Sequence, residues 1–148
     1  MNVIVKNANA GDVEAIARLH RSCFEATYPT FQKLHAPDED TEHFAEVLRK
    51  NEVYVAKSDG QLGGYCAFED GWLNDHYIAR AFQFRGLGTR LLEKIKQSHN
   101  EIQLWTFQVN LNARRFFERN GFSVLEETEG SGNEQGQPDM RYFWRRSG

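Results

Sequence analysis

The sequence predicts an α/β fold (α+β in some schemes) with a mixed, mostly antiparallel sheet of about seven strands and about four helices. Segments with apolar residues at helical spacing alternate with short apolar runs typical of strands. The dipeptides Asp59-Gly60 and Asp70-Gly71 indicate hairpin turns, which predict a central antiparallel meander. A strand, helix, strand order follows, and it would bring two parallel strands together.

Size and charge restrict the classes of function. The 148 residues fit one domain, 1–148. The net charge of −3 argues against a nucleic-acid partner. No apolar run approaches the roughly 20 residues that span a bilayer, and the N-terminus lacks a signal-peptide pattern, so we expect a cytoplasmic protein without a membrane partner. Cys23 and Cys66 match no metal or redox spacing, which predicts two buried free thiols and no metal site.

The N-terminal half predicts one strand and two helices before the meander. Residues 2–7 predict the strand, and Asn9 with Asp12 forms a capping-box pattern that opens the first helix. The second helix is expected over 38–50, with acids in its first turn and bases in its last, as the helix dipole favours. The apolar face of the first helix consists of Ile16, Leu19, Cys23 and Phe24. That of the second consists of Phe44, Val47 and Leu48.

The meander predicts strands over 52–57 and 61–69 and a third strand candidate over 72–80. Strict alternation along this third strand places two sets of side chains on opposite faces. One set is Trp72, Asn74, His76 and Ile78, and the other is Asp75 and Tyr77.

The C-terminal half predicts two helices and three strands. Leu87, Leu91, Leu92 and Ile95 recur on one helical face, and residues 102–107 predict a short buried strand in which Trp105 belongs to the core. Asn110 is expected to cap a helix that contains Ala113, Phe116 and Phe117 and ends at Gly121. Residues 122–127 and 140–145 predict the last two strands, on either side of a polar, Gly-rich loop.

The stretch QFRGLGTRLLEKIK, residues 83–96, places Gly86 and Gly88 at the start of a helix. The first N–H groups of a helix have no intrahelical partner, and glycines let an anion approach them closely. Arg85 and Arg90 could add charge-assisted contacts to a phosphate. A plain tight turn explains a lone G-x-G equally well.

The residues Gln83-Phe84-Arg85-Gly86-Leu87-Gly88 match the pattern Q/R-x-x-G-x-G/A, the acetyl-CoA pyrophosphate loop of the GNAT superfamily of N-acetyltransferases. The downstream NLNARRFFERNGF, residues 110–122, resembles a second pattern of that family, N-x-x-A-x-x-F-Y-E-x-x-G-F. Both lie at the expected separation, and the order of elements is similar over essentially the whole chain. The sequence around these motifs resembles that of a bacterial subgroup with few defined substrates.

The resemblance implies a fold splayed between the fourth and fifth strands, with acetyl-CoA in the opening. The backbones of Tyr77, Ile78 and Ala79 would contact the pantetheine, and the Ile78 N–H would act as oxyanion donor. Asn110 would contact the pantetheine arm or serve only as a helix cap. The cosubstrate residues implied are Tyr77, Ile78, Ala79, Gln83, Phe84, Arg85, Gly86, Leu87, Gly88, Thr89, Arg90, Asn110 and Phe117.

The implied reaction is direct attack of a primary amine of a small molecule or peptide on the thioester in a ternary complex. His76 is the preferred base, because it titrates near neutral pH and lies on the Ile78 face, although a structural histidine remains the alternative. Asp75 and Glu69 are the reserve bases. The family's usual acid, a tyrosine, is replaced by Phe117, so Tyr142 or water would protonate the thiolate, or it would leave unassisted.

The resemblance implies acceptor contacts at Phe24, Tyr28 and Phe31, which ordinary packing would explain as well. The acidic late loop would suit a cationic amine or simply face solvent. Members of the family are often dimers, so a homodimer is among the implied partners. Because of Phe117, a GNAT-fold acyl-CoA-binding module without turnover is the alternative function.

Overall fold

One mixed sheet of seven strands runs through the computed structural model of the protein, which describes residues 2–147. The strands β4 and β5 are parallel, and all other neighbours are antiparallel. The predicted fold class and the one parallel pair are therefore confirmed. The strands, in their order across the sheet, are β1 (Val3–Asn7), β2 (Glu52–Ser58), β3 (Gln61–Glu69), β4 (Trp72–Ile78), β5 (Glu101–Phe107), β7 (Asp139–Arg145) and β6 (Ser123–Thr128).

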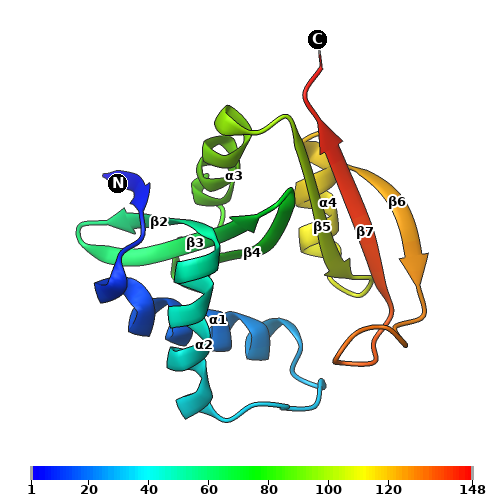
Figure 1. The fold of residues 1–148 in the computed structure, drawn as a ribbon, viewed down its shortest axis with the longest axis horizontal. Coiled ribbons are helices and arrows are strands. Elements are labelled where there is room, and N and C mark those ends of the chain that lie inside the picture. Colours follow the sequence, from blue (N-terminus) through cyan, green and yellow to red (C-terminus); the bar gives the residue numbers. More distant parts are fainter. Residues whose placement is uncertain (1, 148) are drawn as a thin grey trace.

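Helices lie on both faces of the sheet (Figure 1). They are α1 (Val13–Thr27), α2 (Pro37–Lys50), α3 (Leu87–Ser98) and α4 (Leu111–Arg119), with short 3-10 turns η1 (Ala10–Asp12) and η2 (Arg80–Phe82). Helices α1 and α2 pack on one face of the N-terminal half, around a core that contains Ile16, Phe44 and Tyr65. The opposite face packs against α3 and α4, around Leu91, Leu92 and Tyr142.

The predicted local signals account for the helix ends. The Asn9–Asp12 capping box is present, with the Asn9 N–H on the Asp12 carboxylate at 2.9 Å. Asn110 caps α4 by accepting from the Ala113 N–H at 3.1 Å. Gly121 adopts a positive φ of 91° just after α4, where a left-handed residue commonly ends a helix.

Two expectations about β4 and β5 were wrong. A register shift in the β3–β4 pairing leaves Asn74 as the extra residue, so Leu73 and not Asn74 shares the face of His76. Trp105 is 44% exposed instead of buried, because Ile102 and Leu104 face the core and alternation turns Trp105 to the uncovered face of β5.

The two free cysteines also differ in burial. Cys66 is fully buried as expected, whereas Cys23 is only half-buried at the inner side of α1. Among the described residues no helix combines the length and apolar character needed to cross a membrane. Residues 2–147 also contain no group of three or more His, Cys, Asp or Glu side chains placed to hold a metal ion.

Candidate active site

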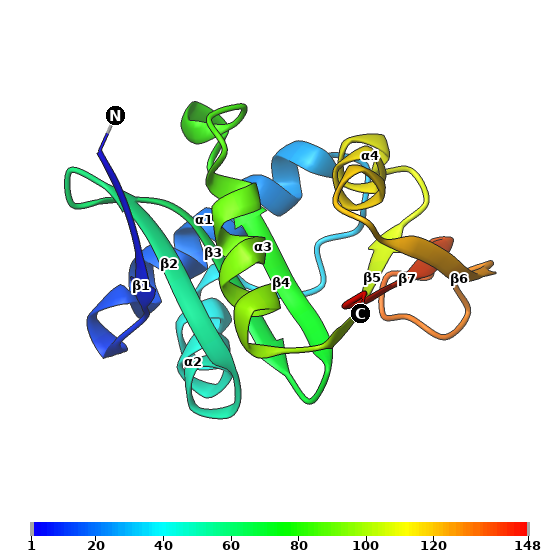
Figure 2. The ribbon, with the colours of Figure 1, turned by 90° about the horizontal axis from the view of Figure 1, so that it is seen from above.

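The sheet opens between β4 and β5. The two strands share one Cα pair, Trp72 with Gln103, and the Gln103 N–H donates to the Gly71 carbonyl at 2.8 Å. Beyond this pair the strands diverge, while β5 pairs along its whole length with β7 (Figure 2). Strand edges that part in this way leave backbone polar groups without a ladder partner. The splay that the sequence resemblance implied is present.

The end of β4 directs one backbone N–H into this opening. The Ala79 N–H donates to the Gly63 carbonyl of β3 at 2.8 Å, and the Ala79 carbonyl accepts from the Phe82 N–H, so both groups are used within the chain. Backbone N–H groups alternate between the two edges of a strand, so the Tyr77 N–H also faces β3 and the Ile78 N–H faces the opening. Of the three residues expected to contact pantetheine, Ile78 has the matching backbone direction.

The β4–α3 loop leaves the start of α3 open to an anion. Gly86 is the N-cap with a φ of 83°, and no side chain caps this end. A Cβ at Gly86 would meet nothing within 4 Å, so the absent side chain keeps free space in front of the first N–H groups of α3. Leu87 anchors the turn in the core, whereas Phe84 is 99% exposed. The loop therefore fits a phosphate group.

Gly88 and Arg90 have structural contacts that the sequence did not indicate. A Cβ at Gly88 would lie 3.2 Å from His76 Cε1 and 3.4 Å from the Phe116 ring, so close packing favours glycine here. The Arg90 guanidinium donates to the Val3 carbonyl of β1 at 3.0 Å. Arg85 lies 6.0 Å from the Phe82 ring centroid. Thr89 is exposed on the first turn of α3.

Gln83 links the loop to the strand that precedes it. Its side-chain amide donates to the Ile78 carbonyl at 3.3 Å, and the Cys23 thiol lies 3.4 Å from the same oxygen. The loop and the end of β4 are thus held together at the residue whose N–H faces the opening.

His76 lies beside the opening but is held by the neighbouring helices. Its Nε2 is 2.9 Å from the Gly88 carbonyl oxygen, and a carbonyl can only accept, so Nε2 carries the proton. The ring stacks on Phe116 at 5.1 Å and meets Phe117 edge-on at 5.6 Å. Burial lowers the pKa of His76, although the Gly88 hydrogen bond opposes the shift. The imidazole is therefore neutral at pH 7.

A cavity of about 730 Å³ fills the splay and is called the splay cavity here. Its walls include His76 and Tyr77 of β4, Trp105 of β5, and Asn110 and Phe117. Tyr142, the sequence candidate for an acid, is not among the residues that line it. Its side chain is fully buried, and its hydroxyl donates to Glu118 at 2.6 Å. Burial, followed by the Glu118 contact, raises the pKa of Tyr142.

The three aromatic residues predicted for the acceptor side lie together at one end of the splay. Tyr28 stacks on Phe31 at 4.6 Å and contacts Phe24 at 4.9 Å, and Phe107 of β5 meets Tyr28 edge-on at 5.2 Å. The Asn110 amide donates to the Tyr28 hydroxyl at 2.8 Å. Tyr28 thus closes the splay cavity between α1 and α4, with its ring in the aromatic cluster.

An open groove of about 1030 Å³, the outer groove, meets the splay cavity at Asn110. It runs between α1, the end of β4 and the start of α4, and Ala79 and Gln83 line it. Arg18, Arg80 and Arg115 also line it and make it favourable for an anionic ligand. Sequence reasoning missed these arginines, because only the fold brings α1 and α4 to the same groove.

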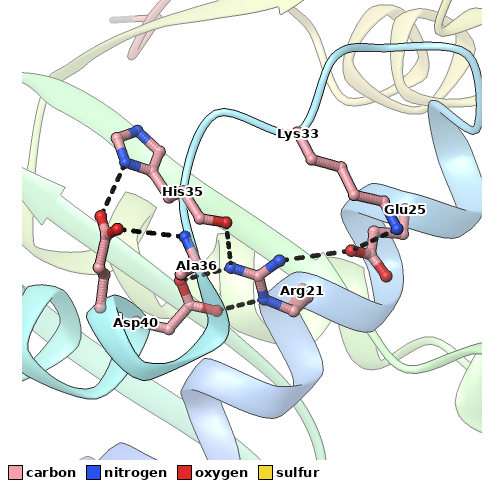
Figure 3. A network of polar contacts seen from close by, with 7 residues as sticks. Arg21, Glu25, Lys33, His35, Ala36 and Asp40 are labelled. Atoms are coloured by element: carbon pink, nitrogen blue, oxygen red, sulfur yellow. Dashed lines mark hydrogen bonds and ion pairs between the residues drawn. The ribbon is translucent and has the colours of Figure 1, made fainter.

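On the other side, a cavity of about 620 Å³ lies between α1, α2 and the β6–β7 loop. This loop cavity shares Phe107 and Asn133 with the splay cavity. Arg21 lies between two carboxylates on its wall, with Nε 2.6 Å from Asp40 and Nη1 3.4 Å from Glu25 (Figure 3). The two cavities and the groove therefore adjoin one another through shared wall residues, with the splay cavity in the middle.

The late loop also contributes charged side chains to this cavity. His35, on the loop before α2, lies 3.2 Å from Glu39 and 2.6 Å from Glu134 of the β6–β7 loop. Lys33 adds an ion pair to Glu25 at 3.6 Å. In the late loop Glu134 thus has His35 as its partner, whereas Lys33 pairs with a carboxylate of α1.

Comparisons with known proteins agree with this architecture. The family model described as "Acetyltransferase (GNAT) domain" matches residues 49–124, which is just over half of the chain. Over 133 residues the chain is 23% identical to an uncharacterized N-acetyltransferase, YafP, of Escherichia coli strain K12, covering 85% of each chain. It is also 28% identical over 80 residues to the E. coli peptidyl-lysine N-acetyltransferase YiaC, covering 53% of this chain and 55% of that protein.

Other proteins of known structure have the same fold. The PaiA N-acetyltransferase of Thermoplasma acidophilum, determined in complex with coenzyme A, superposes with a TM-score of 0.79. The match covers 99% of this chain and 100% of that one at 20% identity, so it shows that the two folds are the same.

Proposed function

This chain belongs to the GNAT family of acetyltransferases, and we propose that it transfers an acetyl group from acetyl-CoA to a primary amine of a small molecule or peptide. Family membership makes it an acetyl-CoA-dependent acetyl-transferring enzyme. The observation that carries the proposal is the splay, where the Ile78 N–H faces a cavity joined on one side to a basic groove and on the other to the loop cavity.

The residues present fit acetyl-CoA. The outer groove offers arginines to phosphate groups, and the uncapped start of α3 offers backbone N–H groups beside Gly86, where no atom would obstruct an anion. The opening between β4 and β5 has strand edges that an extended arm can pair with. We infer that the nucleotide end lies in the outer groove and the thioester in the splay cavity.

The chemistry would be a direct acyl transfer. The nitrogen lone pair of the amine attacks the thioester carbon, and a C–N bond forms while negative charge develops on the thioester oxygen. The Ile78 N–H is positioned to stabilise that charge. Collapse of the intermediate breaks the C–S bond, coenzyme A leaves as a thiolate with the bonding electron pair, and the nitrogen releases a proton to solvent to give the amide. Thiols have an ordinary pKa near 8.5, so the thiolate is a fair leaving group without an acid.

Phe117 is consistent with unassisted departure of the thiolate. Its ring lines the splay cavity, where it offers no proton, and the buried Tyr142 hydroxyl is already bonded to Glu118. The alternative of an acyl-CoA-binding module rests on this same residue. Orienting two bound reactants supplies much of the rate of such a transfer, so the missing acid does not prevent turnover.

Two measurements on the purified protein test the proposal. Calorimetry with acetyl-CoA measures binding, and a thiol reagent follows release of coenzyme A with spermidine, tyramine, glucosamine and a lysine peptide blocked at its N-terminus. The peptide is included because the relative YiaC is named for peptidyl-lysine. We expect binding and thiol release with at least one amine. Absence of binding would overturn the assignment, and binding without release for every amine would favour the binding module.

A further inference from the structure

His20 lies on α1 between the sheet and the loop cavity, where three aromatic rings hold its imidazole. Its ring centroid is 5.9 Å from Phe24, 5.1 Å from Phe44 and 4.9 Å from Tyr77, which it meets edge-on at 82°. These contacts come from α1 itself, from α2 and from β4, so the ring has little freedom to rotate away. The sequence did not single out this residue.

The ring nitrogens of His20 have no hydrogen-bond partner among residues 2–147, although the ring lines the loop cavity. This differs from His76, whose Nε2 is bonded to the Gly88 carbonyl, and from His35, whose two nitrogens face Glu39 and Glu134. A half-buried polar side chain that faces a cavity without a partner is available to a ligand there.

The position of His20 connects the two reactant spaces. Tyr77, its edge-on neighbour, lines the splay cavity, while His20 itself lines the loop cavity. Phe107 and Asn133 line both, so the two cavities adjoin at these residues. The His20–Tyr77 contact therefore links the wall of the loop cavity, where an amine could enter, to the wall of the splay cavity.

We propose that His20 is the general base that deprotonates the acceptor amine, an inference that rests on the proposed function. The amine arrives as an ammonium ion, and its proton passes to a ring nitrogen of His20, which becomes imidazolium. The freed lone pair then attacks the thioester carbon. The departing thiolate keeps the C–S electrons, the second proton of the acetylated nitrogen passes to solvent, and His20 releases its own proton to solvent or to that thiolate, so charge and protons balance.

The charges around His20 suit this role. Burial lowers the pKa of His20, and the carboxylates of Asp75 on β4 and Asp40 on α2 oppose the shift. His43 of α2 and Arg21 of α1 lower it further. Because the lowered pKa lies below the ordinary value near 6.5, the ring is neutral at pH 7 and can accept a proton. Asp75 is close enough to interact with the imidazolium once it forms.

The test uses His20→Phe, which keeps an aromatic ring against Phe24, Phe44 and Tyr77 but removes both nitrogens. With the fastest amine of the panel, kcat should fall roughly 10²- to 10⁴-fold at pH 7, the usual contribution of a general base. In the wild type kcat should rise with pH through the pKa of His20. The variant should lack this rising limb of the pH profile. The affinity for acetyl-CoA, measured by calorimetry, should not change.

Two controls separate catalysis from packing. His99 is another half-buried histidine, whose ring is tilted against Phe68 at 4.2 Å. It is absent from the walls of the two cavities and the outer groove, so His99→Phe should keep the wild-type pH profile. His20→Ala should recover activity when imidazole is added, because imidazole replaces the missing base. A role limited to packing would give no such rescue.

The outcomes distinguish this inference from the proposed function. If the wild type releases thiol and His20→Phe matches its rate and pH profile, His20 is not the base and the proposed function stands. If the wild type binds acetyl-CoA but releases no thiol with any amine, the proposed function fails and the base assignment fails with it. Loss of the pH limb together with imidazole rescue supports the proposal.

Discussion

The side-chain amide of Asn110 donates a 2.8 Å hydrogen bond to the hydroxyl of Tyr28, and its oxygen caps α4 through the Ala113 N–H. One residue thus fixes the start of α4 and ties it to the end of α1. Both Asn110 and Tyr28 line the splay cavity, so this bond sets the width of the cavity at its aromatic end.

Asn110→Ala should lower the free energy of unfolding by about 2 kcal/mol. About 1 kcal/mol comes from the lost helix cap and about 1 kcal/mol from the lost bond to Tyr28. Asn110→Ser keeps a capping oxygen but is too short for Tyr28, so it should cost only about 1 kcal/mol. Urea denaturation of both variants measures this, and equal losses would show that the Tyr28 bond contributes nothing.

Gly86→Val should weaken acetyl-CoA binding. The residue has a φ of 83° with nothing within 4 Å of a Cβ, so valine adds backbone strain and fills the space in front of the α3 N–H groups. Gly60, in the β2–β3 turn, is the matched control, with a φ of 80° and the same open space. Both variants should lose similar stability, and calorimetry should find weakened binding only for Gly86→Val. Equal affinity in the two would remove this loop from the binding site.

His76→Phe should destabilise the protein without abolishing the pH limb of kcat. The variant loses the 2.9 Å hydrogen bond to the Gly88 carbonyl, which is worth about 1 kcal/mol. Its ring can still stack on Phe116. Urea denaturation gives the stability and steady-state kinetics the pH profile. A variant of unchanged stability that lacks the pH limb would make His76 the base.

The pKa of His35 should lie above its ordinary value. The hydrogen bond to Glu134, followed by that to Glu39, raises this pKa, since both carboxylates favour the imidazolium. The stability that His35 gains from Glu134 and Glu39 is then fully present below about pH 6.5, the ordinary pKa, and is lost as pH rises through the higher pKa of the folded state. An NMR titration of the His35 ring measures it. Glu134→Gln should lower the value, and Glu129→Gln, whose parent carboxylate bonds Ser131 instead, should not.

The sequence predicted the elements because their signals are local. The Asn9–Asp12 capping box, the Asp-Gly turns and Gly121 act within a few residues, and each is found where its pattern predicted it. The apolar face that contains Leu91, Leu92 and Ile95 likewise lies in the core. The errors come from tertiary context. Strict alternation could not anticipate the bulge at Asn74, and the uncovered face of β5 exposes Trp105 because no helix packs there.

The candidate site was predictable only in part. The glycine pattern at 86 and 88 pointed to the anion-binding turn, yet the packing of Gly88 against His76 joins residues 12 positions apart and has no sequence signal. The arginines of the outer groove and the position of His20 against Tyr77 likewise depend on how α1 crosses the sheet. Hydrophobic periodicity predicts which face of a helix is buried, but not which polar groups meet across the fold.

The single Cα pair between Trp72 and Gln103 has a consequence for folding cooperativity. Backbone hydrogen bonding is nearly interrupted in the middle of the sheet, so the two halves are held together mainly by side-chain contacts and by the Gln103–Gly71 hydrogen bond. A ligand bound between the two halves would bridge their strand edges by hydrogen bonds, so that the whole chain would unfold as one cooperative unit. Bound acetyl-CoA should therefore raise the resistance of the folded chain to limited proteolysis.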